Sequence, residues 1–247
     1  MSSANPAVNE AIYRRAGLAT SAADVMTLQG AVGKSFILLV ILIVVASVAW
    51  SQAEAGALGY GLLMAGLIGG AIIAMVTIFM PKTAPFTAPL YAAFEGLLLG
   101  AISALFEAAH SGIVLQAIGL SVAVPLILLF LYGTRVIRAT ENFKIGVIAA
   151  TGAIFLVYLV DVILSFFRKD VPFIHETGWV GIGFSLLVVV IASLNLILDF
   201  DFIERGVAAG APKYLEWYGG FSLLVTLVWM YLEILRLLAK LTGGGRD

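Results

Sequence analysis

The feature that most constrains this chain is a series of seven apolar runs, each about as long as a bilayer is thick. A membrane-spanning helix needs about 20 predominantly apolar residues. The runs cover residues 35–51, 57–80, 86–108, 112–132, 145–167, 178–199 and 217–240. They are continuous and lack the alternation of apolar and polar residues that strands of a membrane barrel show. We therefore predict an all-α polytopic membrane protein with seven transmembrane helices.

The composition supports a membrane location. Of the 247 residues, 62% are hydrophobic and 12% are charged, whereas a soluble domain carries about 25% charged residues. The sequence has no cysteine and two histidines, which excludes disulfides and Cys-based metal sites and argues against a multi-histidine metal site. No basic patch is large enough to indicate nucleic-acid binding.

The apolar runs define one transmembrane domain between two short flanking segments. Residues 1–34 are comparatively polar and predict an N-terminal tail, residues 35–240 form the membrane domain, and residues 241–247 form a C-terminal tail. The first run begins at Phe36, which is too far along the chain for the apolar core of a cleaved signal peptide. We therefore expect an uncleaved first helix and no second domain.

Basic residues predict the orientation, because they concentrate on the cytoplasmic side of membranes. With a cytoplasmic N-terminus, the outside loops carry only Arg168 and Lys169. The inside segments then carry Arg14, Arg15, Lys34, Lys82, Arg135, Arg138, Lys144, Arg205 and Lys213. A seventh helix that crosses fully would leave Arg236, Lys240 and Arg246 outside, where their side chains would snorkel to the interface. The alternative is a last helix that does not cross, and we favour the full crossing.

Four acidic residues lie within or at the end of apolar runs: Glu95, Asp161, Asp199 and Glu233. Such a charge costs at least ~2.5–3.5 kcal/mol, so it indicates a functional path or a bonded partner. Glu95 is about 14 Å along its helix, near the bilayer midplane, where a neutral interhelical hydrogen bond and a pathway role are equally good interpretations. Asp161 lies one to two turns before Arg168 and Lys169, and we favour a structural pairing with them.

The sixth run ends in a cluster of carboxylates, LILDFDFIERG. We interpret Asp201 and Glu204 as solvated groups at the membrane boundary. Glu233 lies three residues before Arg236, so a local ion pair is its simplest interpretation. If Asp199 and Glu233 approached each other, both could not ionise cheaply. Such a pair would act as a proton-operated latch, or as a Ca²⁺ site when both are ionised.

Four short segments occur in an order that points to one family. LILDFDFIERG is similar to a Tyr-Asp-Thr-Gln-like motif, with Asp199 at the position of its Asp. MYLEIL, at 230–235, is similar to a Leu-Tyr-Leu-Asp-Phe-Ile-like motif, with Glu233 replacing its Asp. FEGLLLG, at 94–100, and RATENF, at 138–143, are similar to further segments of this kind. Over roughly residues 30–240, the chain resembles bacterial members of the Bax-inhibitor-like family, the transmembrane Bax-inhibitor-motif proteins.

This resemblance implies a fold and a mechanism. It implies seven helices with six surrounding the last, in a bacterial plasma membrane. It also implies that Asp199 and Glu233 form a pH sensor that controls a Ca²⁺ leak. Family members often use an Arg on the second helix to engage the pair, but residues 57–80 hold no charged residue. The candidate replacements are Arg236, Arg135 and Arg138.

Two functional hypotheses follow. The first is a pH-gated leak for Ca²⁺ or another cation, with candidate pathway or partner carboxylates Glu95, Asp161 and Asp201. The second is a regulatory protein that modulates a membrane protease or a stress-response partner through the N-terminal tail and cytoplasmic loops. An intramembrane enzyme is disfavoured, because the last two runs lack the Gly-x-Gly-Asp context of known aspartyl intramembrane proteases. We expect no cofactor other than a bound or transported Ca²⁺.

Overall fold

The computed structural model describes residues 24–54, 56, 59–167, 171, 174, 176 and 178–243. These residues form long helices joined by short connections. The helices are α2 (Leu28–Glu54), α3 (Gly59–Phe79), the 3-10 helix η2 (Pro81–Thr83), α4 (Ala84–Ala109), α5 (Ile113–Gly133), α6 (Glu141–Phe166), α8 (Trp179–Ala208) and α9 (Leu215–Gly243). Seven of them are long and apolar enough to cross a membrane. The predicted all-α polytopic fold is therefore confirmed.

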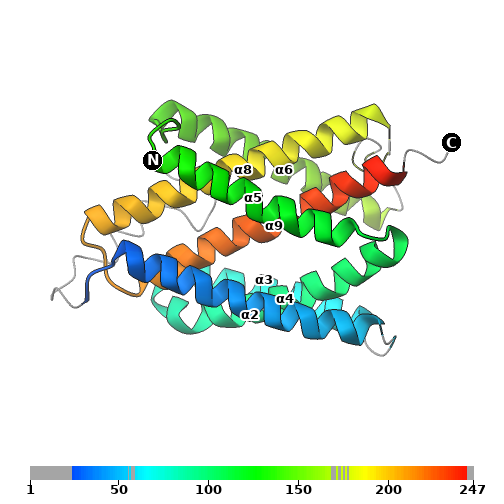
Figure 1. Cartoon of the computed structure of the whole chain (residues 1–247), viewed down its shortest axis with the longest axis horizontal. Helices are drawn as coiled ribbons and strands as arrows, with labels where there is room; N and C mark the ends of the chain where they lie inside the picture. Colours follow the sequence, from blue (N-terminus) through cyan, green and yellow to red (C-terminus); the bar gives the residue numbers. More distant parts are fainter. Residues whose placement is uncertain are drawn as a thin grey trace.

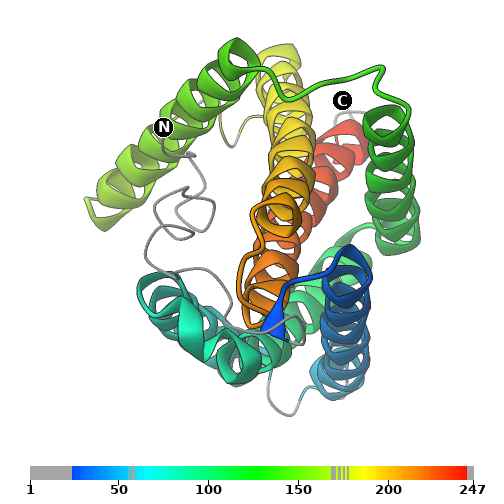
Figure 2. The same ribbon diagram turned by 90° about the vertical axis from the view of Figure 1, so that its left-hand side faces the viewer.

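The last helix lies in the middle of the bundle (Figure 2). Helix α9 packs against α2, α4, α5 and α8, whereas α3 packs on α4 and α2, and α6 packs chiefly on α8. The start of α2 and the end of α9 lie at opposite ends of the bundle (Figure 1). The seventh helix therefore runs the full length of the bundle, as favoured from the sequence.

The folded part of the chain begins earlier than residue 35. Helix α2 starts at Leu28, and the segment before it pairs with the connection between α8 and α9. Val25 forms an isolated antiparallel bridge with Pro212, and the Met26 N–H donates to the Ala211 carbonyl at 2.7 Å. The end of the predicted tail thus belongs to the membrane domain, while residues 1–23 lie outside the described part of the chain.

Apolar side chains cover much of the outside of the bundle, and several charged ones are buried inside it. Phe86 is 83% exposed and Trp179 is 90% exposed, as expected of side chains that contact lipid. Among the described residues, the buried charged ones are Glu95, Asp199, Glu216, Glu233 and Lys240. Because lipid tails offer no hydrogen bonds, these groups need partners within the protein.

Glycines let α4 approach its neighbours closely. A Cβ at Gly66 of α3 would lie 2.5 Å from the backbone nitrogen of Leu98. A Cβ at Gly100 of α4 would lie against the carbonyl oxygen of Ala46 and 2.7 Å from the Cβ of Ala49 in α2. Backbone contacts of this kind drive helix association in lipid, where the hydrophobic effect does not.

Candidate functional site

Asp199 is held at the contact between α8 and α9. Its side chain is buried, at 1% exposure. The Ser222 hydroxyl donates to its Oδ1 at 2.6 Å, and the Thr226 hydroxyl donates to its Oδ2 at 2.6 Å. Because Ser222 and Thr226 are four residues apart, both hydroxyls lie on one face of α9. Each oxygen of the carboxylate therefore accepts a hydrogen bond from the central helix.

Glu233 connects α9 with α6. Its Oε1 accepts hydrogen bonds from the Tyr158 hydroxyl at 2.8 Å and from the Arg236 guanidinium at 2.7 Å. Arg236 also donates to the Tyr158 oxygen at 2.6 Å and lies 5.2 Å from the centre of its ring. The local ion pair with Arg236 is as predicted. The second oxygen, Oε2, is buried and has no hydrogen-bond partner among the described residues.

Asp199 and Glu233 have different hydrogen-bond partners among the described residues. Thr226, which binds Asp199, precedes Glu233 by two helical turns, a rise of about 10 Å. Each carboxylate accepts hydrogen bonds from hydroxyl groups of its own. Within the described residues, no group of three or more His, Cys, Asp or Glu side chains could hold a metal ion. A joint role for the two carboxylates therefore stays a prediction.

Of the three candidate counter-charges, only Arg236 contacts either carboxylate among the described residues. Arg135 instead pairs with Glu204, whose carboxylate raises the pKa of the guanidinium by hydrogen bonding. The Arg138 Nε donates to the Arg135 carbonyl at 3.4 Å. The prediction for these two arginines was wrong because they follow the end of α5 at Gly133, at the end of the bundle.

The acidic residues beyond Asp199 form interhelical ion pairs. Asp201 is 15% exposed in its side chain and lies 3.0 Å from the Lys144 ammonium of α6. Glu204 accepts a hydrogen bond from the Tyr132 hydroxyl of α5 at 2.5 Å and pairs with Arg135. The interpretation as solvated boundary groups is wrong for Asp201, because α8 continues to Ala208 and turns it toward α6. The Glu204 side chain is 42% exposed, so it keeps contact with solvent beside its ion pair. The two acidic residues join the ends of α5 and α6 to α8.

Glu95 lies between α4 and α3, in the interior of the bundle. It is 8% exposed, and a Cβ at Gly70 would lie 2.9 Å from its Oε1. The Tyr91 hydroxyl, one turn earlier, is its hydrogen-bonding neighbour. The other oxygen, Oε2, is buried without a hydrogen-bond partner among the described residues. Glu95 therefore retains one free acceptor inside the membrane domain.

Asp161 stabilises the chain that follows α6. Its Oδ1 accepts a hydrogen bond from the Val171 backbone N–H at 2.9 Å. This contact is structural in kind, as favoured from the sequence. The predicted partners, Arg168 and Lys169, lie outside the described residues.

An ion pair that the sequence did not reveal joins the first and last helices. Glu216 of α9 is fully buried and pairs with Lys34 of α2. Its Oε1 also accepts hydrogen bonds from the backbone N–H and hydroxyl of Thr27, at 2.8 and 3.0 Å. Thr27 immediately precedes α2, so Glu216 places a negative charge at the N-terminus of that helix, where the helix dipole favours it.

Lys240 is turned into the protein near the end of α9. It is 6% exposed, and its ammonium donates to the Gly181 carbonyl at 3.0 Å and the Ser185 hydroxyl at 2.9 Å. The expected snorkelling to the interface is therefore wrong for this residue. The first turns of α8 supply polar atoms within reach, so the ammonium is bonded without leaving the bundle.

Comparison with known protein families gives a match that covers nearly the whole chain. The family model described as Bax inhibitor 1 like matches residues 5–243. The matched region includes every helix described above. No curated protein matches the chain.

Proposed function

Because this chain belongs to the Bax inhibitor 1 like family, we propose that it is a pH-sensitive leak for Ca²⁺ or another cation, and not an enzyme. Asp199 and Glu233 are the proposed proton-sensing groups. The observation that carries the proposal is the contact among Tyr158, Glu233 and Arg236, which ties an outer helix to the central one through a buried carboxylate.

Protonation of Glu233 would weaken that contact. Helix α6 packs chiefly on α8. Its Tyr158 hydroxyl forms hydrogen bonds with Glu233 and Arg236 of the central helix α9. A neutral carboxyl group loses its ion pair with Arg236 and is a weaker acceptor than a carboxylate. Because hydrogen bonds to charged groups contribute about 1.5–3 kcal/mol, the loss is large enough to shift a two-state helix arrangement.

Protonation of Asp199 would act on the second helix contact. As a carboxylate, Asp199 accepts from both Ser222 and Thr226. A protonated carboxyl group is itself a donor at one oxygen, so one of these two hydroxyls must change from donor to acceptor, and the charge-assisted hydrogen bonds to α9 weaken. Acid would thus loosen α8 and α6 from α9 together, and we expect the leak to increase as pH falls.

The proposed path for the cation is lined by carboxylate oxygens. Glu95 and Glu233 each keep a buried oxygen without a hydrogen-bond partner among the described residues. Oxygen atoms of this kind are the ligands that Ca²⁺ prefers. Among the candidate pathway carboxylates, Glu95 fits best, because Asp161 and Asp201 are engaged in structural contacts. We also propose a bacterial plasma membrane, as the resemblance implies, and a cytoplasmic N-terminus, which the distribution of basic residues supports.

The proposal is tested by measuring Ca²⁺ flux into proteoliposomes at a series of pH values. The unchanged protein is expected to leak more strongly as pH falls. Glu233→Gln removes the charge as protonation does, so its flux should stay high and lose its pH dependence. Asp199→Asn should behave in the same way. Glu141→Gln is the matched control, because Glu141 is 62% exposed in its side chain and pairs only with Lys144 among the described residues.

Two results would count against the leak. A Glu233→Gln protein with the pH dependence of the unchanged protein would remove Glu233 from the switch. Folded, inserted protein that gives no flux above empty vesicles at any pH would reject the leak altogether. The second result would favour the regulatory hypothesis, in which the chain modulates a membrane protease or a stress-response partner.

A further inference from the structure

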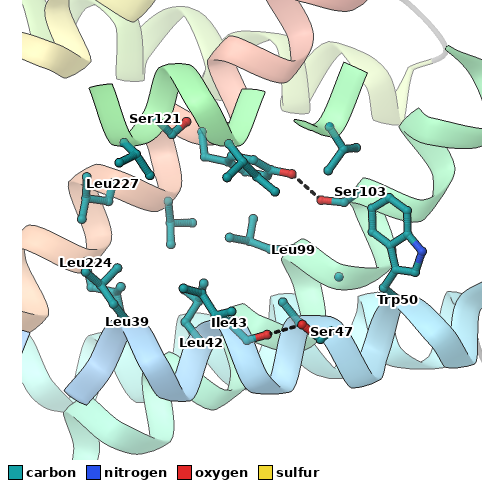
Figure 3. Close-up of a pocket in the computed structure, with 17 residues that line it drawn as sticks. Leu39, Leu42, Ile43, Ser47, Trp50, Leu99, Ser103, Ser121, Leu224 and Leu227 are labelled. Atoms are coloured by element: carbon teal, nitrogen blue, oxygen red, sulfur yellow. Dashed lines mark hydrogen bonds between the residues drawn. The ribbon is translucent and has the colours of Figure 1, made fainter. Parts of the chain in front are cut away.

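A groove of about 500 Å³ opens between α2 and α5. Figure 3 shows α2 on one side, α5 on the other and α9 with α4 behind them. Helices α2 and α5 each pack on α4 and α9, but they make few or no contacts with each other. The seam between them is therefore open along its length.

The groove continues toward the other end of the bundle. A smaller cavity of about 120 Å³ shares Leu39, Leu224 and Leu227 with it. Along α2, the two cavities extend from Ser35 to Trp50, a rise of about 22 Å. Half of a bilayer's hydrocarbon core is about 15 Å thick. The groove is therefore long enough for a hydrocarbon chain that enters from one leaflet.

The lining of the groove is apolar, and its polar groups are mostly bonded within the protein. The Ser103 and Tyr231 hydroxyls lie 2.6 Å apart, and the Ser47 hydroxyl donates to the Ile43 carbonyl at 2.8 Å. Among the buried polar side-chain atoms of the described lining residues, the Ser121 hydroxyl lacks a hydrogen-bond partner. An ordered water needs two to four polar partners, so water is a poor occupant of this space.

The groove is continuous with the lipid-facing surface. Ile43 of α2 and Ile118 and Val122 of α5 line it, and the same side chains are 58%, 47% and 55% exposed on the outside of the bundle. In a spanning protein, this outside is the surface that meets the bilayer. The groove is thus an inward extension of the lipid contact, and lipid reaches it without crossing a polar barrier.

We propose that the groove between α2 and α5 binds an acyl chain of a bilayer phospholipid. Its volume falls within the range of about 300–1,000 Å³ that is typical of small-molecule sites. The occupant contacts Leu224 and Val228 of α9, which are 1% and 6% exposed. A bound chain therefore reaches the middle of the central helix, whereas the exposed large apolar side chain of α9 among the described residues is Leu241, near its end.

Photolabelling tests the site, because a lipid chain bound in the groove contacts the middle of α9 and the surrounding lipids do not. The full chain is reconstituted into phosphatidylcholine vesicles that contain phosphatidylcholine with a diazirine in the middle of one acyl chain. After illumination, peptide mass spectrometry locates the adducts. Adducts on α9 at residues 224–231 are expected in addition to adducts on outward-facing residues. Adducts confined to the outward-facing residues of the unchanged protein would overturn the proposal.

A pair of substitutions on neighbouring turns of α2 sharpens the test. Ser47→Trp adds a ring inside the groove, whereas Val44→Trp adds the same ring on the outside, because Val44 is 57% exposed and does not line the groove. We expect Ser47→Trp to lower α9 labelling about tenfold, equivalent to about 1.4 kcal/mol of binding free energy. Val44→Trp should leave it unchanged. Equal α9 labelling in the two variants would also overturn the proposal.

Discussion

Replacing Lys34 with methionine is expected to lower the free energy of unfolding by about 3–5 kcal/mol, because it leaves a buried carboxylate without its cation. Glu216 is fully buried and would keep only the hydrogen bonds from Thr27. Its charge would then lie inside the protein with two neutral donors. Unfolding of the purified protein in mixed detergent micelles, followed by helical circular dichroism, measures the difference.

Lys82→Met is the matched control for this prediction. Lys82 is exposed and forms no ion pair among the described residues, so its replacement should change the unfolding free energy by no more than about 0.5 kcal/mol. Equal stability of the Lys34 and Lys82 variants would mean that the ion pair with Glu216 does not stabilise the bundle.

Gly100→Val is expected to destabilise the bundle by about 3 kcal/mol, the upper end for overpacking. A Cβ at this position meets the carbonyl oxygen of Ala46 and the Cβ of Ala49. Neither atom can turn aside as the end of a flexible side chain could, so α4 and α2 must move apart. The same detergent unfolding measurement detects the loss.

The same change at Gly119 of α5 provides the comparison. A Cβ there has no heavy atom of another element within 4 Å, so Gly119→Val should alter stability by no more than about 0.5 kcal/mol. If Gly100→Val were as stable as Gly119→Val, the close approach of α2 and α4 would not depend on the missing side chain.

The sequence predicted the helices better than it predicted their ends. A helix must contain about 20 apolar residues to cross a bilayer, so the apolar runs alone indicate the number and order of the spanning helices. The true helices extend beyond them where polar residues continue the helical hydrogen bonding. Helix α2 begins at Leu28, before the apolar run, and α8 continues past Asp199 to Ala208. This extension explains why Asp201 and Glu204 face other helices.

The candidate site was predictable only where its contacts are local. Glu233 and Arg236 are three residues apart, so helical periodicity alone suggests their ion pair. Tyr158 lies 75 residues before Glu233, and Thr226 lies 27 residues after Asp199. No single-sequence pattern brings such residues together. The resemblance to a family identified the two carboxylates, but it did not reveal that hydroxyl groups hold each of them separately.

The contact between Lys34 and Glu216 also has a consequence for how the chain is made. The two residues are separated by 182 positions, and synthesis proceeds at about 5–20 residues per second, so Lys34 is made about 10–40 s before its partner. During that interval the first helix carries an unmatched positive charge. The segment before α2 gains its partner segment when the connection between α8 and α9 is made. Helix α9 then supplies the matching carboxylate a few residues later. Completion of the bundle is therefore coupled to emergence of the last helix, and a chain cut short before it would keep Lys34 without its ion-pair partner.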